Sequence, residues 1–288
     1  MIGRIAAIAL TAAALVAPAV AVAQVASAAI DEKKLTTGKA TIDPAKGYIY
    51  FHGPSRLTMV LLKTPSDAQR AKFEADWKEG FDKAKKKYPA KLARWQSDMK
   101  VASEAKLKLP EKPVEPTEQT FSIGDIETRM VVSVGPLFAF AKSDADIGYL
   151  EEVEPGTYTL YGPIMLAPAA GGSGLCYCMG SVKFDVAPGK ITNLGNFAAV
   201  HGFEQVVDIP QKNDRPTEEN WDLPASLRAY PSVRADLHAA GKMNNFYGAM
   251  VGRMAAVPGV LGYERDTVVD LKAAPPAEGA PQVTATGP

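Results

Sequence analysis

The sequence predicts a mainly β protein, an antiparallel β-sandwich or barrel, that carries a helix or helical hairpin inserted at about residues 66–108. Two observations lead to this fold class. Short runs of β-branched and aromatic residues recur between residues 47 and 197, and clusters of glycine and proline separate them. Residues 66–108 instead repeat apolar side chains every three or four positions, which is the period of an α-helix.

The first two predicted strands are residues 47–51 and 57–62. We expect them to be neighbours in one sheet, because the sequence HGPS at residues 52–55 favours a turn. The turns Glu154-Pro155-Gly156 and Ala187-Pro188-Gly189 separate later strands. Those strands are predicted at residues 128–134, 137–140, 156–161, 175–179, 181–186 and 191–197.

The helical insertion begins with a capping box, because Ser66 is followed three residues later by Gln69. Its apolar stripe stays within an arc of roughly 100° at 100° per residue, and keeps its phase across Pro89. One kinked helix over about 67–105 is therefore favoured over two antiparallel helices, although an interior proline costs about 3 kcal/mol and keeps the hairpin open. The stripe consists of Phe73, Trp77, Phe81, Ala84, Tyr88, Leu92, Trp95, Met99 and Ala102.

The insertion is also basic. Residues 66–108 contain twelve Lys or Arg and seven Asp or Glu. One interpretation is that the stripe packs on the body of the protein and the lysines face solvent. The other is that this helix contacts a membrane surface or an anionic polymer. Prolines between residues 109 and 116 predict that the chain then returns in extended form.

Residues 1–28 have the features of a secretory signal peptide. Arg4 precedes an apolar run, and Ala26-Ser27-Ala28 matches a small-residue cleavage site, with residues 21–23 as the second choice. Because no cysteine follows the run, a lipoprotein anchor is not expected, whereas a retained membrane anchor is the alternative. The prediction is an exported protein, periplasmic or extracellular.

Composition limits the remaining possibilities. Removal of residues 1–28 leaves 31 basic and 32 acidic residues, so no nucleic-acid partner is expected. No later stretch is apolar for the 18 or so residues that a membrane span needs, so no transmembrane segment is expected in the mature chain. We expect a β-sandwich domain over 29–210, a C-terminal α/β extension over 211–272 that completes the same domain or forms a second small one, and a disordered tail at 273–288.

The candidate site is a possible disulfide or thiol pair, Cys176 and Cys178, the only cysteines of the chain. In a strand they share one face, with Cα atoms roughly 6.5–7 Å apart, which is at the upper limit for a disulfide. Three interpretations stay open: two buried thiols, a local disulfide made possible by bends at Gly174 and Gly180, or a Cu(I) site with Met179 nearby.

Other residues give weaker signals of chemistry. Ser173 lies among glycines, but the G-x-S-x-G spacing of a hydrolase is missing. The three histidines, His52, His201 and His238, show no metal-binding spacing. The acidic residues at 144–154 fit turn carboxylates better than a calcium or glycosidase site. We therefore predict no catalytic residue, metal or cofactor.

Two phrases of the sequence carry a resemblance to a known family. Residues 153–160 (VEPGTYTL) and 182–194 (VKFDVAPGKITNL) resemble the hairpins of carboxypeptidase-regulatory-like and PEGA-like β-sandwich domains in exported bacterial proteins. The resemblance covers about 50 residues and leaves out the helical insertion. It implies a non-catalytic accessory, adhesive or envelope-associated domain, and it supplies no catalytic residue.

These observations predict an exported, non-catalytic binding or structural module of the bacterial cell envelope. Its expected partner is an unknown envelope protein or polymer, with surface contact through the basic helix. Two other functions are the alternatives: an envelope hydrolase, or a metal- or redox-handling protein that uses Cys176 and Cys178.

Overall fold

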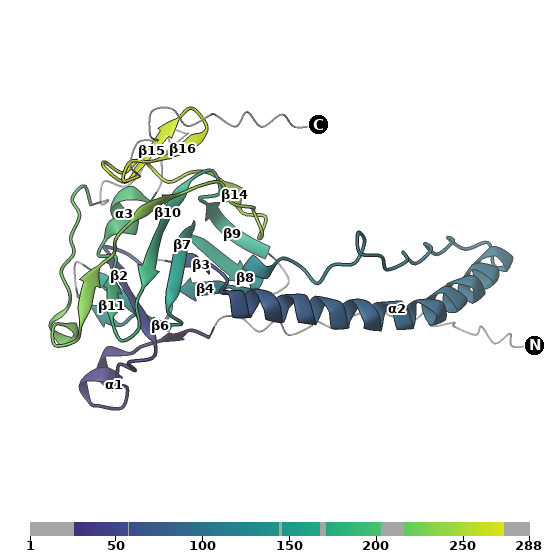
Figure 1. Ribbon diagram of the computed structural model, residues 1–288, viewed down its shortest axis with the longest axis horizontal. Helices are drawn as coiled ribbons and strands as arrows, with labels where there is room; N and C mark the ends of the chain where they lie inside the picture. The colour runs from purple at the N-terminus through teal and green to yellow at the C-terminus, as the bar shows by residue number, and fades with distance from the viewer. Residues whose placement is uncertain (1–25, 57, 144–145, 168–170, 203–215, 274–288) are drawn as a thin grey trace, which may run out of the picture.

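The computed structural model describes residues 26–273 except 57, 144–145, 168–170 and 203–215 (Figure 1). Most of the predicted signal peptide, with the second-choice cleavage site, lies outside the described residues, and so does the predicted tail after residue 273. The fold is mainly β, with sixteen strands in the described part of the chain and one long helix, as the sequence predicts.

Two sheets form the body of the protein. The first contains β1 (Ala28–Ala29), β6 (Ile147–Val153), β2 (Gly47–Gly53), β11 (Ile191–Asn193) and β12 (Ser232–Arg234) in that order, and β5 (Ala141–Lys142) also pairs with β6. The second contains β13 (His238–Ala240), β10 (Ser181–Val186), β7 (Gly156–Gly162), β3 (Met59–Lys63) and β4 (Val131–Val134). Strands from the C-terminal part of the chain, β12 and β13, thus extend both sheets.

Two smaller sheets complete the described strands. One contains β14 (Met250–Val251), β9 (Gly171–Cys176) and β8 (Ile164–Ala167), and the other is the hairpin of β15 (Leu261–Glu264) and β16 (Thr267–Asp270). Most pairs are antiparallel, but β11 runs parallel to β2 and β12, and β14 runs parallel to β9. Within the described residues the strands form these separate sheets and no closed barrel.

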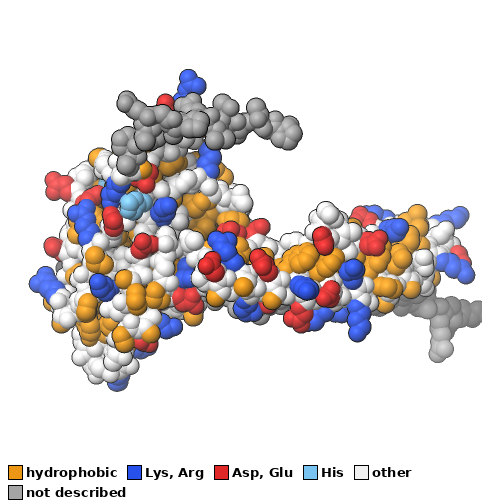
Figure 2. Space-filling model, viewed as in Figure 1, with side chains coloured by type: hydrophobic (Ala, Val, Ile, Leu, Met, Phe, Trp, Pro, Cys, Tyr) orange, Lys and Arg blue, Asp and Glu red, His pale blue; other side chains and the backbone are white. Residues whose placement is uncertain are grey.

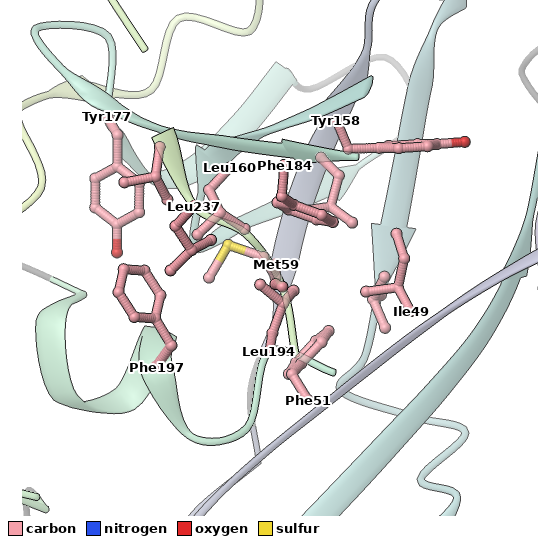
Figure 3. Close-up of a cluster of buried hydrophobic side chains, with 14 of the residues drawn as sticks. Ile49, Phe51, Met59, Tyr158, Leu160, Tyr177, Phe184, Leu194, Phe197 and Leu237 are labelled. Carbon is pink, nitrogen blue, oxygen red and sulfur yellow. The ribbon is translucent and has the colours of Figure 1, made fainter. Parts of the chain in front are cut away.

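The main core lies between the two large sheets (Figure 3). Ile49 and Phe51 from β2 face Met59, Leu160 and Phe184 from the opposite sheet, and each is at most 3% exposed. Alternate residues of each strand point inward, which is how a sandwich buries its apolar surface. The sandwich alternative of the prediction is therefore the observed one.

The prediction that residues 47–51 and 57–62 are neighbouring strands is wrong. β2 pairs with β6 and β11, whereas β3 pairs with β4 and β7 in the other sheet. The segment between them crosses from one sheet to the other instead of closing a hairpin. The strand predicted at 137–140 is also absent, and Leu137 and Phe138 are exposed in a loop.

Four short helices accompany the sheets: α1 (Glu32–Thr36), α3 (Phe197–His201) and the 3₁₀ turns η1 (Ile126–Arg129) and η2 (Ala225–Leu227). The strand predicted at 191–197 ends at Asn193, and the chain enters α3 at Phe197. In the predicted C-terminal extension, residues 225–227 form only the single turn η2.

The long helix α2 (Asp67–Glu104) is continuous through Pro89, which confirms the single-helix prediction over the hairpin. Its 38 residues span about 57 Å at 1.5 Å per residue. The capping box is present, since Ser66 accepts a hydrogen bond from the Gln69 backbone and Gln69 accepts one from the Ser66 backbone. α2 lies between β3 and β4, which pair with each other, so the helix is an insertion in a hairpin as predicted. Figure 1 shows it projecting away from the sheets.

None of the described helices combines the length and the apolar character that crossing a membrane would require.

Candidate functional site

The two cysteines form a disulfide at a turn rather than a pair of residues inside a strand. β9 ends at Cys176, and Cys178 begins the turn that leads to β10. The Cα atoms of Cys176 and Cys178 are 5.1 Å apart, well within disulfide range. Of the strand predicted over 175–179, only residues 175 and 176 are in a strand, at the end of β9. Of the three interpretations the local disulfide is the one that the structure contains.

The chain can turn here because two glycines let the backbones touch. A Cβ atom on Gly174 would lie 2.2 Å from the Pro163 carbonyl oxygen, and one on Gly162 would lie 2.0 Å from the Leu175 carbonyl oxygen. Both glycines also have positive φ, at 136° and 145°. This close approach at the ends of β7 and β9 bends the chain just before Cys176.

The turn is hydrogen-bonded to the C-terminal segment. The Cys176 carbonyl accepts a bond from the Gly252 backbone at 2.8 Å, and the Cys178 carbonyl accepts one from the Met243 backbone at 2.9 Å. Gly252 in turn accepts a bond from the Met179 backbone at 2.9 Å. Residues 243–252 are thus held against the disulfide turn from both ends.

Tyr161 completes this arrangement from β7. Its hydroxyl donates to the Asn244 carbonyl at 2.9 Å and accepts from the Phe246 backbone at 2.8 Å. Burial raises the pKa of the Tyr161 hydroxyl above its ordinary value. Cys176 and Cys178 pack against this side chain in a second apolar cluster, while Tyr177 points the opposite way into the main core (Figure 3).

The position of the disulfide limits its chemistry. Cys176 is fully buried and Cys178 is 3% exposed, so a thiolate from another molecule has no direct path to either sulfur. Sulfurs bonded to each other are not thiolate ligands, which does not favour the Cu(I) interpretation. Among the residues that the structure describes, no cluster of three or more His, Cys, Asp or Glu side chains is placed to hold a metal. The geometry is that of a structural cross-link.

Each histidine that the sequence singled out lies beside a carboxylate. The Asp146 carboxylate contacts Nδ1 of buried His52, and the Asn220 carbonyl lies 3.1 Å from its Nε2. His201 is 2.9 Å from Glu219. His238 lies between Asp236 and Asp270, at 3.4 and 3.6 Å. The three histidines contact different carboxylates in three separate places, so the structure does not bring them together.

The remaining candidates are also separate. Ser173 lies in β9, opposite Met165 of β8. Asp144 lies outside the described residues. Glu151 has its side chain on the core face of β6, opposite Ile49, and burial raises the pKa of this carboxyl to about 7. Glu154 is 3.6 Å from the amine of buried Lys63.

The long helix and the segment that follows it form an arm, defined here as residues 66–125. The nine stripe residues of α2 are buried or partly buried, whereas most other positions of the helix are exposed. Part of the stripe is covered by Phe121 of the returning chain, whose ring centre lies 5.7 Å from that of Trp77 and 5.6 Å from that of Phe81. The interpretation that the stripe packs on the body is wrong for most of its length, because the arm covers its own stripe.

Two indole groups fix the returning segment along the helix. Trp77 donates a hydrogen bond to the Phe121 carbonyl at 3.3 Å, and Trp95 donates one to the Pro110 carbonyl at 3.0 Å. The contacts run in opposite chain directions, so residues 105–125 return antiparallel to α2. A shallow groove remains between Tyr88 and Lys91 of the helix and residues 114–121.

The base of the arm is fixed to the body by charge. Arg129 of η1 donates to Asp76 at 3.1 Å and lies over the Phe73 ring, 4.7 Å from its centre. Lys72 and Arg129 hydrogen-bond to Asp76 and keep the pKa of its carboxyl below the ordinary value. Lys63 of β3 donates to Gln69 at 3.0 Å. These contacts orient the arm where it leaves the sandwich.

The side of α2 turned away from the returning segment is basic. Residues 83–97 contain six Lys or Arg and no Asp or Glu. At 100° per residue, Lys83, Lys87 and Arg94 lie outside the arc of the stripe and within about 40° of one another. We call this the lysine face. Lys83 pairs with Glu79, and Arg94 is 3.7 Å from Asp98.

No direct signal in the sequence identifies the residues that cover the stripe, because Phe121 follows a run of prolines and has no periodic neighbour. The one signal in the sequence that bears on the returning segment is its prolines at 110, 113 and 116, which predict that the chain returns in extended form.

Comparison with models of protein families, with curated proteins and with solved structures finds no match to this chain.

Proposed function

We propose that this chain is an exported, non-catalytic binding module of the bacterial cell envelope, and that the arm is its contact element. The observation that carries the proposal is the arm itself, a helix of 38 residues that projects from the sandwich (Figure 1). Its stripe is covered by residues of the same arm, so the arm has a fold without a partner. Its exposed face is then free to contact one.

The sandwich core does not explain why the arm is so long. The buried residues of the main cluster come from the sheets and the segments beside them, and α2 contributes none of them. A connection between β3 and β4 needs only a few residues. An exposed, charged face on a helix that is about 57 Å long is a feature expected of a recognition element.

Three observations support export. The N-terminal apolar run ends in a small-residue cleavage site, and residues 153–160 and 182–194 resemble the hairpins of envelope-associated sandwich domains. The disulfide between Cys176 and Cys178 fits an oxidising compartment, where such bonds persist. In a hydrolase, a catalytic histidine needs one ring nitrogen placed against the nucleophile. The two nitrogens of His52 instead contact the Asn220 carbonyl and the Asp146 carboxylate, which does not favour the hydrolase alternative.

Photo-cross-linking in the native cells tests the proposal. A photo-reactive amino acid replaces Ala90, which is exposed on the lysine face, or Ser232, which is exposed on β12 of the body. We expect one discrete adduct with an envelope component from position 90 and none from position 232. Equal adducts from both positions, no adduct from position 90, or turnover of chromogenic esters or glycosides by the purified protein would contradict the proposal.

A further inference from the structure

The end of the arm exposes apolar side chains beside lysines. Among the large apolar side chains of the described residues, Val101 is 60% exposed, Leu107 64%, Leu109 51% and Val114 75%. Lys100, Lys106, Lys108 and Lys112 lie between or next to them in the sequence. Figure 2 shows hydrophobic and charged side chains side by side along the arm.

One of these exposed apolar side chains, Val101, lies on the lysine face of the helix. At 100° per residue, Val101 points in the same direction as Lys83 and within about 20° of Arg94. It therefore continues the lysine face to the end of α2. Leu107 lies just beyond the end of α2. Its backbone N–H donates a hydrogen bond to the Ala102 carbonyl at 2.9 Å. The last turn of the arm thus offers leucine and valine side chains at the end of a basic surface.

Two acidic groups of α2 lie beside the lysine face, Glu79 next to Lys83 and Asp98 next to Arg94, and the acidic groups of the returning segment lie elsewhere. Glu111, Glu115 and Glu118 belong to the returning segment, which covers the opposite side of α2. Asp98 and Glu104 are each three residues from Val101 on the helix, and Asp98 is also next to Arg94. A negatively charged surface can therefore approach the lysine face without meeting the glutamates of the returning segment.

We propose that the distal half of the arm docks on an anionic phospholipid surface, an inference that rests on the proposed function and names its partner. The lysine face attracts the headgroups, and Val101, Leu107 and Leu109 enter the boundary between headgroups and acyl chains. The presence of both basic and apolar side chains favours lipid over a soluble anionic polymer. A polymer attracts the cations but has no apolar surface on which the leucines could be buried.

Vesicle binding tests this with two variants of the exported, processed protein. Lys83→Gln/Lys87→Gln/Arg94→Gln removes charge from the lysine face, and Leu107→Ser/Leu109→Ser removes apolar surface at constant charge. Met250→Ser/Val251→Ser is the matched control, because these body residues are 68% and 50% exposed. Unchanged circular dichroism shows that each variant is folded, as expected for substitutions of exposed groups.

We expect the protein to sediment with vesicles that contain phosphatidylglycerol and not with vesicles of phosphatidylcholine alone. The charge variant should bind about 100-fold more weakly, at roughly fivefold per charge, and the leucine variant at least about tenfold more weakly. The control should bind like the wild type.

Three results would overturn the inference: no binding to phosphatidylglycerol vesicles, equal binding to both kinds of vesicle, or a leucine variant that binds like the wild type. Binding of dextran sulfate that survives in the leucine variant while vesicle binding does not change would identify a polymer surface instead. The cross-linking from position 90 separates the two proposals, since a protein adduct there without vesicle binding removes the lipid inference and leaves the binding module standing.

Discussion

Glu151 is buried to 5% exposure on β6, on the face of the sheet that carries Ile49 and the main core. Burial raises the pKa of its carboxyl to about 7, the neighbouring charge of Glu152 adds to this, and a hydrogen bond with Ser27 opposes it. The unfolded chain has an ordinary glutamate pKa near 4.3. The folded protein therefore holds a proton that the unfolded chain releases between these two values.

The sign of the pH dependence follows from this difference. The contribution of Glu151 to stability is fully present below about pH 4 and is lost as the pH rises through about 7. Glu151→Gln should equal the wild type near pH 4 and exceed its free energy of unfolding by on the order of 3 kcal/mol at pH 8. Urea unfolding across the pH range measures this, with exposed Glu118→Gln as the control. Parallel curves for wild type and Glu151→Gln would show that the carboxyl ionises freely in the folded state.

The disulfide makes a second prediction at the residue scale. Cys176→Ala/Cys178→Ala should lower the free energy of unfolding, because the cross-link restricts the unfolded chain. The loss should be only on the order of 2 kcal/mol, because the loop that the disulfide closes is very short. Thiol titration of the wild type, unfolded without reductant, should find no free thiol, and two after reduction. Two thiols without reductant would mean that the native chain carries the free pair.

Tyr161→Phe is the companion variant, since it keeps the disulfide and removes the hydroxyl that bonds to Asn244 and Phe246. This substitution should lower the free energy of unfolding by about 1 kcal/mol.

At the scale of elements, local signals were sufficient for α2. The Ser66 and Gln69 pair predicts where the helix begins, and the stripe that keeps phase across Pro89 predicts that it continues. β10 was likewise found at its observed bounds, because the turn at residues 187–189 limits it. Signals of this kind lie within a few residues of the element they define.

Long-range contacts decide what the sequence did not predict. β2 pairs with β6, about a hundred residues later, so nothing near residues 52–55 shows that the chain crosses between sheets. The turn at Cys176 depends on the close backbone approach at Gly162 and Gly174. These glycines belong to different strands, so the residue pattern of one strand does not reveal their approach. The candidate site could be predicted to contain Cys176 and Cys178, but not that they are bonded.

Pro89 offers a test of the helix as one element. Figure 1 shows α2 bending in its distal part, and Pro89 is the proline inside it. Pro89→Ala should restore the missing hydrogen bond and stabilise the helix locally by up to about 3 kcal/mol. Amide hydrogen exchange over residues 80–100 should slow, whereas Ala90→Gly should speed it by the equivalent of about 1 kcal/mol. Faster exchange in Pro89→Ala would indicate a turn at this position.

At the scale of the whole molecule, the sandwich and the arm bury their apolar residues separately. The sheets enclose the main core, whereas Trp77, Phe81 and Phe121 stack within the arm. Local opening of the distal arm therefore removes none of the contacts that hold the sheets together. The molecule can present a long contact surface without weakening the body that carries it.

Shortening the arm tests this separation directly. Deletion of residues 84–116, with Lys83 joined to Thr117 by a short glycine and serine linker, is feasible because Ala84 and Pro116 line the same groove. The base contacts of Asp76 with Arg129 and of Phe81 with Phe121 remain. We expect the free energy of unfolding of the body to change by less than about 1 kcal/mol, because a shorter loop costs less to close and the core is untouched. Chemical denaturation followed by near-ultraviolet circular dichroism measures it, and a loss of several kcal/mol would show that the distal arm is part of the folding unit rather than a separate contact element.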